Sequence, residues 1–215
     1  IHSTIRNLPG ISGGALINSS GDLVGVLAAG SGLYNESVPV HILNEVIAES
    51  LVSEKKFLDR GKAFKLCTQL LLDVDKLDQQ PSAVLLSKVK YNCDKANNKT
   101  LFDMAGQVFG TFGLLAHSIT FLEKSVKLDP NSPTSLLSLA IALQFQRSYE
   151  RQVKVLDHLL TFLQDDPLVL RMSIQAAAFS KNKSFAKKSL KLLQKNNPNA
   201  YPQAFEFLEN HFESM

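Results

Sequence analysis

The pattern of apolar and polar residues changes once along the chain, close to residue 50. Before that point, short apolar runs are separated by Gly, Ser and Asp, which is typical of strands joined by turns. Residues 15–18 and 23–28 are two such runs, and the Ser-Ser-Gly-Asp segment at 19–22 lies between them. This arrangement predicts a β-hairpin.

A helix is predicted to close this first segment. Residues 30–37 are expected to form a loop, and residues 38–40 a short extended run. Over residues 41–51 the apolar positions then recur at helical spacing.

From residue 57 onward the pattern is helical throughout. Pro81 is expected to occupy the N-terminal turn of the second helix of this part, because proline lacks the N–H that a helix start leaves unpaired. The connecting loops are short and carry Pro130, Pro133, Pro167 and Pro198. Helices are predicted over residues 57–77, 84–91, 102–113, 114–128, 134–146, 149–163, 168–179, 185–194 and 201–212.

The helices suggest a repeat. Pro130 and Pro167 are 37 residues apart and Pro167 and Pro198 are 31 apart, which brackets the roughly 34-residue tetratricopeptide period. The apolar and small residues that fit the motif are Phe102, Ala105, Gly106, Phe109 and Leu122, then Leu136, Leu139, Ala140 and Leu143, then Ala186 and Leu190.

Residues 98–198 therefore resemble a degenerate tetratricopeptide array, with a possible capping helix at 201–215 and a divergent helical pair at 57–97. Ser118 and Ser125 depart from the motif, which usually has alanine there, and the second helix of the second repeat fits poorly. A generic helical bundle is the alternative. In either case small residues at helix crossings let the axes approach closely, and the helices are expected to serve protein interaction.

Composition allows a sizeable core. The chain has 215 residues, of which 45% are hydrophobic, so one or two globular domains are expected. No apolar run reaches the roughly 20 residues that a membrane helix needs, and the first residues do not resemble a secretory signal. Because the sequence opens on Ile1 rather than Met, we expect it to be a piece of a longer protein.

Two cysteines and a basic helical part complete the composition. Cys67 and Cys93 lie in predicted helices without a CxxC pair, so two buried or half-buried thiols are expected, with a disulfide or metal role as the alternative. Residues 1–50 have a net charge of −3 and residues 51–215 one of +6. The lysines of 181–195 are expected to form a solvated face, with an acidic partner or nucleic acid as the alternative.

The segment with the clearest chemical character is Pro9-Gly10-Ile11-Ser12-Gly13-Gly14-Ala15-Leu16. Glycines on both sides of Ser12 allow φ angles closed to other residues and leave main-chain N–H groups uncovered. The segment formally satisfies G-x-S-x-G, the nucleophile elbow of α/β-hydrolases, but that motif requires a helix directly after the serine. A strand is predicted here instead.

The order of features after Ser12 resembles the C-terminal half of the second barrel of chymotrypsin-fold serine proteases, closest to the trypsin-like Htr type. The resemblance covers residues 1–50: a nucleophile turn, a hairpin, a pocket-wall strand and a closing helix. It implies that Ser12 is the nucleophile and that the N–H groups of Gly10 and Ser12 form the oxyanion hole. Ala28, Ala29 and Gly30 would pair with the substrate backbone and border the specificity pocket, and His41 would start the closing helix without acting as a base.

The chain departs from that family in several places. Ile11 stands where Asp or Asn usually precedes the serine, and Ala15 stands where Pro usually follows the second glycine. Arg6 occupies the region of the specificity-pocket base and is expected to be solvated. The family's catalytic histidine and aspartate precede the serine, yet only eleven residues precede Ser12, and His2 is in the wrong place for the base.

The sequence thus predicts a mainly α chain with an N-terminal β segment. Residues 1–53 would be part of a chymotrypsin-like barrel, 54–97 a divergent helical pair, and 98–215 tetratricopeptide-like repeats with a capping helix. We expect a serine endopeptidase acting on polypeptides, coupled to a protein-binding domain, with this fragment inactive alone. No cofactor, metal site or nucleic-acid partner is predicted. A non-catalytic helical-repeat scaffold with a remnant β segment is the alternative.

Overall fold

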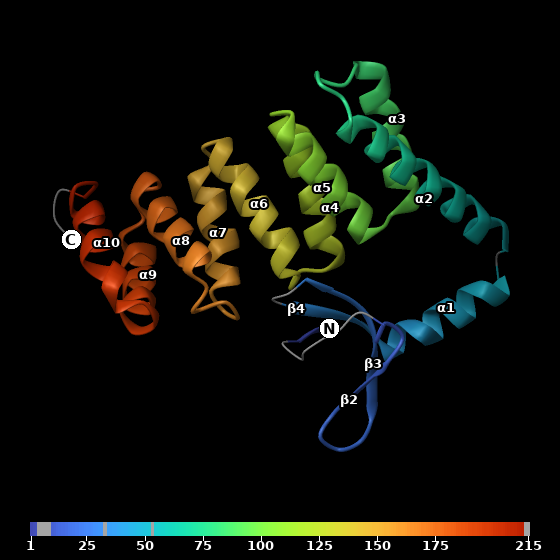
Figure 1. Cartoon of the computed structure of the whole chain (residues 1–215), viewed down its shortest axis with the longest axis horizontal. Coiled ribbons are helices and arrows are strands. Elements are labelled where there is room, and N and C mark those ends of the chain that lie inside the picture. The colour runs from blue at the N-terminus through green and yellow to red at the C-terminus, as the bar shows by residue number, and fades with distance from the viewer. Residues whose placement is uncertain (4–9, 32–33, 53, 213–215) are drawn as a thin grey trace. The chain divides into compact units, whose positions relative to one another are not determined.

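The computed structural model describes residues 1–3, 10–31, 34–52 and 54–212. Within these residues the protein is mainly helical, with a four-stranded antiparallel sheet and ten α-helices (Figure 1). This agrees with the predicted fold class at that level. The chain divides into two compact units, Ile1–Lys62 and Ala63–Met215, which are described separately below.

The first unit is built on the sheet. Its strands are β1 (His2–Ser3), β2 (Ala15–Ile17), β3 (Leu23–Ser31) and β4 (Tyr34–Pro39), in the order β1-β4-β3-β2. The predicted hairpin of β2 and β3 is confirmed. Helix α1 (Val40–Val52) follows β4 and contacts β3 and β4, so the predicted closing helix is also present.

An asparagine holds the hairpin turn. The Asn18 side-chain oxygen accepts hydrogen bonds from the N–H groups of Ser20 and Asp22, both at 2.9 Å. Gly21 has φ +86°, a conformation that glycine adopts without steric cost. The Ser/Gly/Asp composition of the turn therefore has a direct structural cause.

The prediction of a loop over residues 30–37 is wrong, because most of these residues belong to strands. Gly30 and Ser31 end β3, and Tyr34–Pro39 is β4, which pairs with β3 from Gly25↔Pro39 to Ser31↔Tyr34. The polar residues Asn35 and Ser37 are buried in this pairing. Polar side chains at buried strand positions remove the apolar alternation by which a strand is recognised in a sequence.

The second unit and the helix that leads into it contain the remaining helices. In chain order, they are α2 (Glu54–Asp75), α3 (Ala83–Ala96), α4 (Lys99–Thr111), α5 (Leu115–Leu128), α6 (Pro133–Phe145), α7 (Tyr149–Leu159), α8 (Pro167–Phe179), α9 (Lys183–Asn196), the 3₁₀ turn η1 (Pro198–Ala200) and α10 (Tyr201–Glu209). Every helix predicted beyond residue 57 is present.

Some helix boundaries differ from the predictions. Helix α7 ends at Leu159, whereas the prediction extended it to 163. Leu160 and Leu163 are buried like the apolar residues of the helix, but they lie in the segment that follows it. Pro81 precedes the N-cap Ser82 and therefore lies outside α3.

Helices α4 to α10 repeat at a constant interval. Helices α4, α6, α8 and α10 begin at residues 99, 133, 167 and 201, so each step is 34 residues; α5, α7 and α9 begin at 115, 149 and 183, with the same step. The proline spacings of 37 and 31 are unequal because the prolines are not equivalent. Pro133 and Pro167 are the first residues of their helices, whereas Pro130 and Pro198 lie in turns.

The helix caps follow the same interval. Asn98, Ser132 and Asp166 are the N-caps of α4, α6 and α8, and each side chain accepts a hydrogen bond from a backbone N–H of the first turn. Gly113, Arg147 and Lys181 all have positive φ, of 70°, 59° and 56°. After each of them, the next N–H bonds back to the carbonyl five residues earlier, as in a Schellman turn.

Arg147→Gly should raise the free energy of unfolding by about 0.5–1 kcal/mol. A side chain in the left-handed conformation carries a steric cost that glycine lacks, and the greater freedom of glycine in the unfolded chain offsets part of the gain. Urea denaturation of the whole chain measures the change. Lys154→Gly, at an exposed position inside α7, is the matched control and should destabilise by about 1 kcal/mol. Equal effects at the two sites would contradict the left-handed conformation of Arg147.

The core of the second unit runs from helix to helix. A cluster of buried residues from α2 to α5 includes Leu71, Val89, Phe102 and Phe109, and a second cluster joins α5 to α6. The rings of Phe109 and Phe121 stack with centroids 5.5 Å apart. Of the apolar residues that mark the first two of these helices, Leu71, Val74 and Val89 are fully buried, whereas Phe64, Leu66, Val84 and Tyr91 are exposed.

Gly106 of α4 packs tightly against Leu122 of α5. A Cβ atom built on Gly106 would lie 2.4 Å from Leu122 Cγ and 2.7 Å from Leu122 Cδ2. The prediction that a small residue here permits close helix packing is confirmed. Ser118, at a position where alanine was expected, donates a 2.6 Å hydrogen bond to the Gly106 carbonyl, which satisfies its buried hydroxyl.

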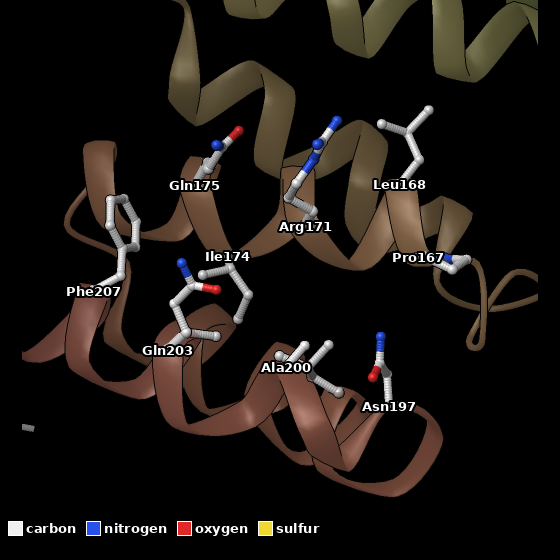
Figure 2. Close-up of a pocket in the computed structure, with 11 residues that line it drawn as sticks. Pro167, Leu168, Arg171, Ile174, Gln175, Asn197, Ala200, Gln203 and Phe207 are labelled. Carbon is white, nitrogen blue, oxygen red and sulfur yellow. The ribbon is translucent and has the colours of Figure 1, made fainter.

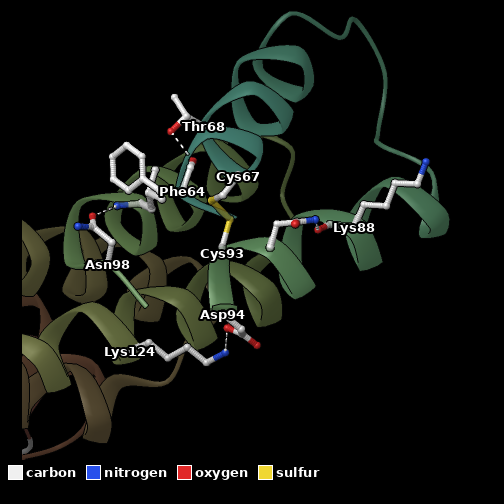
Figure 3. The surroundings of a disulfide bond; sticks show 10 residues. Phe64, Cys67, Thr68, Lys88, Cys93, Asp94, Asn98 and Lys124 are labelled. Carbon is white, nitrogen blue, oxygen red and sulfur yellow. Dashed lines mark hydrogen bonds and ion pairs between the residues drawn. A yellow bond between two sulfur atoms is a disulfide. The ribbon is translucent and has the colours of Figure 1, made fainter. Parts of the chain in front are cut away.

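A disulfide joins α2 to α3 (Figure 3). Cys67 and Cys93 are fully buried, as predicted, and their Cα atoms are 5.0 Å apart, so they form the disulfide that was the alternative to two thiols, and the expectation of thiols is wrong. The physical reason is the helical hairpin, which turns the chain back between the two residues and brings their side chains together in the core.

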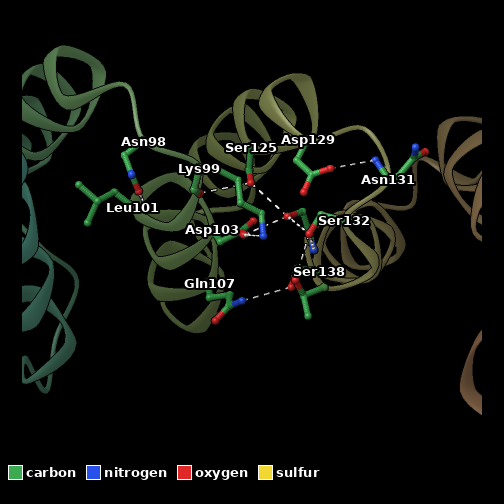
Figure 4. Close-up of polar contacts among 12 residues, drawn as sticks. Asn98, Lys99, Leu101, Asp103, Gln107, Ser125, Asp129, Asn131, Ser132 and Ser138 are labelled. Atoms are coloured by element: carbon green, nitrogen blue, oxygen red, sulfur yellow. Dashed lines mark hydrogen bonds and ion pairs between the residues drawn. The ribbon is translucent and has the colours of Figure 1, made fainter. Parts of the chain in front are cut away.

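A buried polar cluster lies where α4, α5 and α6 meet (Figure 4). The Ser135 hydroxyl lies 2.9 Å from Asp103 Oδ2 and 3.1 Å from Ser125 Oγ, and Lys99 Nζ lies 3.3 Å from the same carboxylate oxygen. Ser125 also donates to the Lys99 carbonyl at 3.3 Å. These contacts explain how two serines are tolerated at buried helix positions.

Polar contacts also link alternate helices along the chain. Ion pairs join Asp94 to Lys124, Glu123 to Arg151 and Asp157 to Lys188, and so connect α3 to α5, α5 to α7 and α7 to α9. Hydrogen bonds of 3.4 Å from Gln107 to Ser138 and from Gln144 to Gln175 connect α4 to α6 and α6 to α8. Exposed ion pairs contribute little stability. These contacts nevertheless join each helix to the next but one in the same way, so successive helix pairs pack in the same relative position.

Candidate functional site

The candidate nucleophile Ser12 lies in a tight turn before β2. The Gly14 N–H donates to the Ile11 carbonyl at 2.9 Å, which closes a four-residue turn with Ser12 as its second residue. Gly13, the third residue, has φ +89°, the value that a type II turn requires there. Gly10 also has a positive φ, of 99°. Gly10 and Gly13 therefore adopt backbone conformations that other residues rarely adopt, as predicted for the glycines on both sides of Ser12.

The turn is fixed to strand β3. The Gly13 N–H donates to the Leu27 carbonyl at 2.7 Å, and the Leu27 N–H donates to the Gly14 carbonyl at 2.8 Å. A Cβ atom on Gly14 would lie 2.9 Å from the Ile11 carbonyl oxygen and 3.3 Å from Leu27 Cδ1. Both glycines after Ser12 are thus needed for the turn to sit against the strand.

The side chain of Ser12 is exposed. Its hydroxyl donates a long hydrogen bond, 3.4 Å, to the Ala28 carbonyl. Among the residues that the structure describes, Ser12 Oγ has no other hydrogen-bond partner, and no acceptor is bonded to the N–H of Gly10 or of Ser12. Within the described residues, the Ala28 carbonyl is thus the sole partner of the hydroxyl, and the two N–H groups predicted to form the oxyanion hole have none.

The three residues expected to bind substrate lie at the exposed end of β3. On one side, Ala29 and Gly30 pair with Glu36 and Asn35 of β4, and the register shifts at Ala28, as in a β-bulge. On the other side, pairing with β2 and the preceding turn extends only to Leu27 in the described part of the chain. Ala28, Ala29 and Gly30 are all exposed.

In the described part of the first unit, Ser12 has no histidine partner. His2 belongs to β1, which is two strands away from β3, or about 10 Å at the usual strand spacing. His41 is exposed at the start of α1, and the other three histidines belong to the second unit. A general base must lie within hydrogen-bond distance of the proton it removes, so no triad is assembled among the described residues of the first unit. Arg6 and Pro9 lie outside those residues.

The second unit contains a hollow that the sequence did not reveal. It has a volume of about 550 Å³ and lies between α8 and α10 (Figure 2). Its polar lining residues are Arg171, Gln175, Asn197 and Gln203. No local motif marks them, because residues from separate repeats come together only when the helices stack. Their positions in the 34-residue interval also differ, since Arg171 is the fifth residue of α8 and Gln203 the third of α10, so the interval does not mark them either.

A second hollow, of about 840 Å³, lies beside α9 and is lined by Lys188, Lys191 and Lys195 among others. The three lysines are exposed, as predicted, and Lys188 pairs with Asp157.

Comparison with known proteins finds no family model that matches the chain, and no match among curated proteins. Across the described residues, the helices are too short or too polar to span a lipid bilayer.

Proposed function

We propose that Ser12 is the nucleophile of a trypsin-like serine endopeptidase, and that the helices of the second unit bind the polypeptides or partner proteins on which it acts. The observation that carries the proposal is the turn at Ser12. An exposed serine hydroxyl stands between two glycines of positive φ and beside two N–H groups that have no acceptor among the described residues. An acyl-transfer site needs a nucleophile and oxyanion donors in this relation.

The edge of β3 supports the same proposal. Beyond Leu27, the side of β3 that faces β2 has no described strand, and a substrate in extended conformation could add there as a further strand. Ala28 and its neighbours would then place the scissile carbonyl near the Ser12 hydroxyl, which already lies against the Ala28 carbonyl.

The proposal requires two further groups. A serine is activated when a histidine accepts its proton and a carboxylate orients that histidine. Neither lies against Ser12 in the described residues, so in this proposal residues outside the present sequence supply both. The 215-residue chain alone should then be inactive.

For the helical unit we propose a tetratricopeptide-like interaction domain. The 34-residue interval of helix starts, N-caps and left-handed turns supports this assignment, as does the contact between Gly106 and Leu122. Arrays of this type present extended surfaces to partner proteins. The scaffold hypothesis keeps this role without the chemistry, and it is supported by the absence of a base beside Ser12 among the described residues of the first unit.

Labelling with a fluorophosphonate, which reacts with activated serines, tests the proposal. The protein isolated at its native length should be labelled, and Ser12→Ala should abolish the labelling. Ser20→Ala, in the hairpin turn of the same unit, is the matched control and should leave it unchanged. A folded protein of native length that takes up no label would favour the scaffold, and labelling that survives in Ser12→Ala would assign the reactive serine elsewhere.

A further inference from the structure

We propose that the hollow between α8 and α10 binds an extended polypeptide segment through an acidic side chain that pairs with Arg171. This inference rests on the proposed interaction role of the helices and is independent of the chemistry at Ser12.

The charge of the hollow specifies the charge of the ligand. Arg171 is the only charged residue among the eleven that line it. The guanidinium is exposed, and within the described part of the chain no carboxylate forms an ion pair with it. A guanidinium presents a fixed fork of donors that matches a carboxylate, and the pair is stronger beside apolar surface than in open water. An anionic group is therefore the expected occupant.

The remaining polar groups match a peptide backbone. Gln175 lies on α8, Gln203 on α10 and Asn197 just before η1, and the two helices form the facing walls of the hollow (Figure 2). Each amide can donate and accept hydrogen bonds, as successive N–H and C=O groups of an extended chain require. Ile174 and Leu193, both largely buried, contribute the apolar part of the lining.

The neighbouring helix α6 extends the surface beyond one small ligand. Gln144 of α6 donates a 3.4 Å hydrogen bond to Gln175 of α8, so the two helices adjoin at the hollow. Ile141 stands 34 residues before Gln175 and is 37% exposed, and Phe145, one turn later, is 73% exposed. A ligand that places its acid at Arg171 can continue over α6 with apolar side chains, which favours a polypeptide over a small carboxylate.

Selection from a displayed library of random dodecapeptides tests the inference on the whole chain. Peptides selected by the unaltered protein should share an Asp or Glu next to an apolar residue. A synthetic peptide of that consensus should bind Arg171→Gln about tenfold to a hundredfold more weakly, the usual range for a lost charge-assisted contact. Lys191→Gln, an exposed α9 lysine that does not line this hollow, should leave its affinity unchanged.

The other outcomes separate this inference from the proposed function. Peptides that bind without a shared acid, or that bind Arg171→Gln as tightly as the unaltered chain, would overturn the role of Arg171 and leave the interaction role standing. Glutarate, tested as a free carboxylate, should bind far more weakly than the peptide; equal affinity would overturn the polypeptide assignment. Failure to select any peptide would overturn this inference and leave standing both a role of the helices in binding folded partner proteins and the proposal for Ser12.

Discussion

Replacing Cys67 and Cys93 together by alanine should lower the free energy of unfolding by about 2–4 kcal/mol. The disulfide closes a loop between residues 26 apart in sequence, and the chain-entropy model gives about 3.5 kcal/mol for a loop of that length. Because the bond joins α2 to α3, whose buried residues belong to one cluster with those of α4 and α5, its loss should weaken this end of the array most.

Urea denaturation with and without a reducing agent measures the effect of the disulfide. Reductant should shift the transition of the unaltered protein toward that of the double variant and should leave the variant itself unchanged. An unaltered protein whose unfolding is the same under both conditions would contradict the disulfide. Since the cysteines are fully buried, reduction should be tested at equilibrium, after incubation in urea.

Gly106→Ala should destabilise the chain by about 1–3 kcal/mol, although alanine is the better helix former. The added methyl would overlap Leu122, whose Cγ lies 2.4 Å from the built Cβ position. Gly110→Ala in the same helix is the matched control. Its Cβ would meet only Ser118 Oγ, at 3.4 Å, so it should stabilise by about 0.5–1 kcal/mol.

A double-mutant cycle identifies the cause of the Gly106 effect. Leu122→Ala alone should cost about 2–5 kcal/mol, because Leu122 is almost fully buried. In that background Gly106→Ala should no longer destabilise, since the atoms that it would overlap are gone. If Gly106→Ala cost the same in both backgrounds, the destabilisation would not come from the α4–α5 contact.

The helical fold could be predicted from sequence to a large extent because its determinants are local. Apolar spacing predicts the helices, and the small residue Gly106 correctly indicates close helix packing, whereas its contact with Leu122 is known only from the structure. The proline spacing does not reveal the exact interval, because Pro130 lies in the turn before α6, whereas Pro133, the first residue of α6, is the one equivalent to Pro167.

What could not be predicted depends on residues that are distant in sequence. The pairing of Cys67 with Cys93 requires the geometry of a helical hairpin, which no spacing rule supplies. Strand β4 carries buried polar residues, so its sequence resembles that of a loop. At Ser12, the turn and the hairpin followed from the glycines and the Ser/Gly/Asp cluster, whereas Arg171 and its neighbours became a site only through the stacking of α8 and α10.

The stacking of the helical hairpins has a consequence for how the second unit opens. The principal contacts of α4 to α10 run between neighbours in the chain, and α10 packs on α8 and α9. In such an array, stability is approximately a sum of terms from each hairpin and each junction, and the ends fray first. The hollow at Arg171 has α10 as one of its walls. A ligand that contacts both α8 and α10 would therefore stabilise the packing of α10 on α8. The fraction of molecules with α10 folded would then increase with the fraction that have ligand bound.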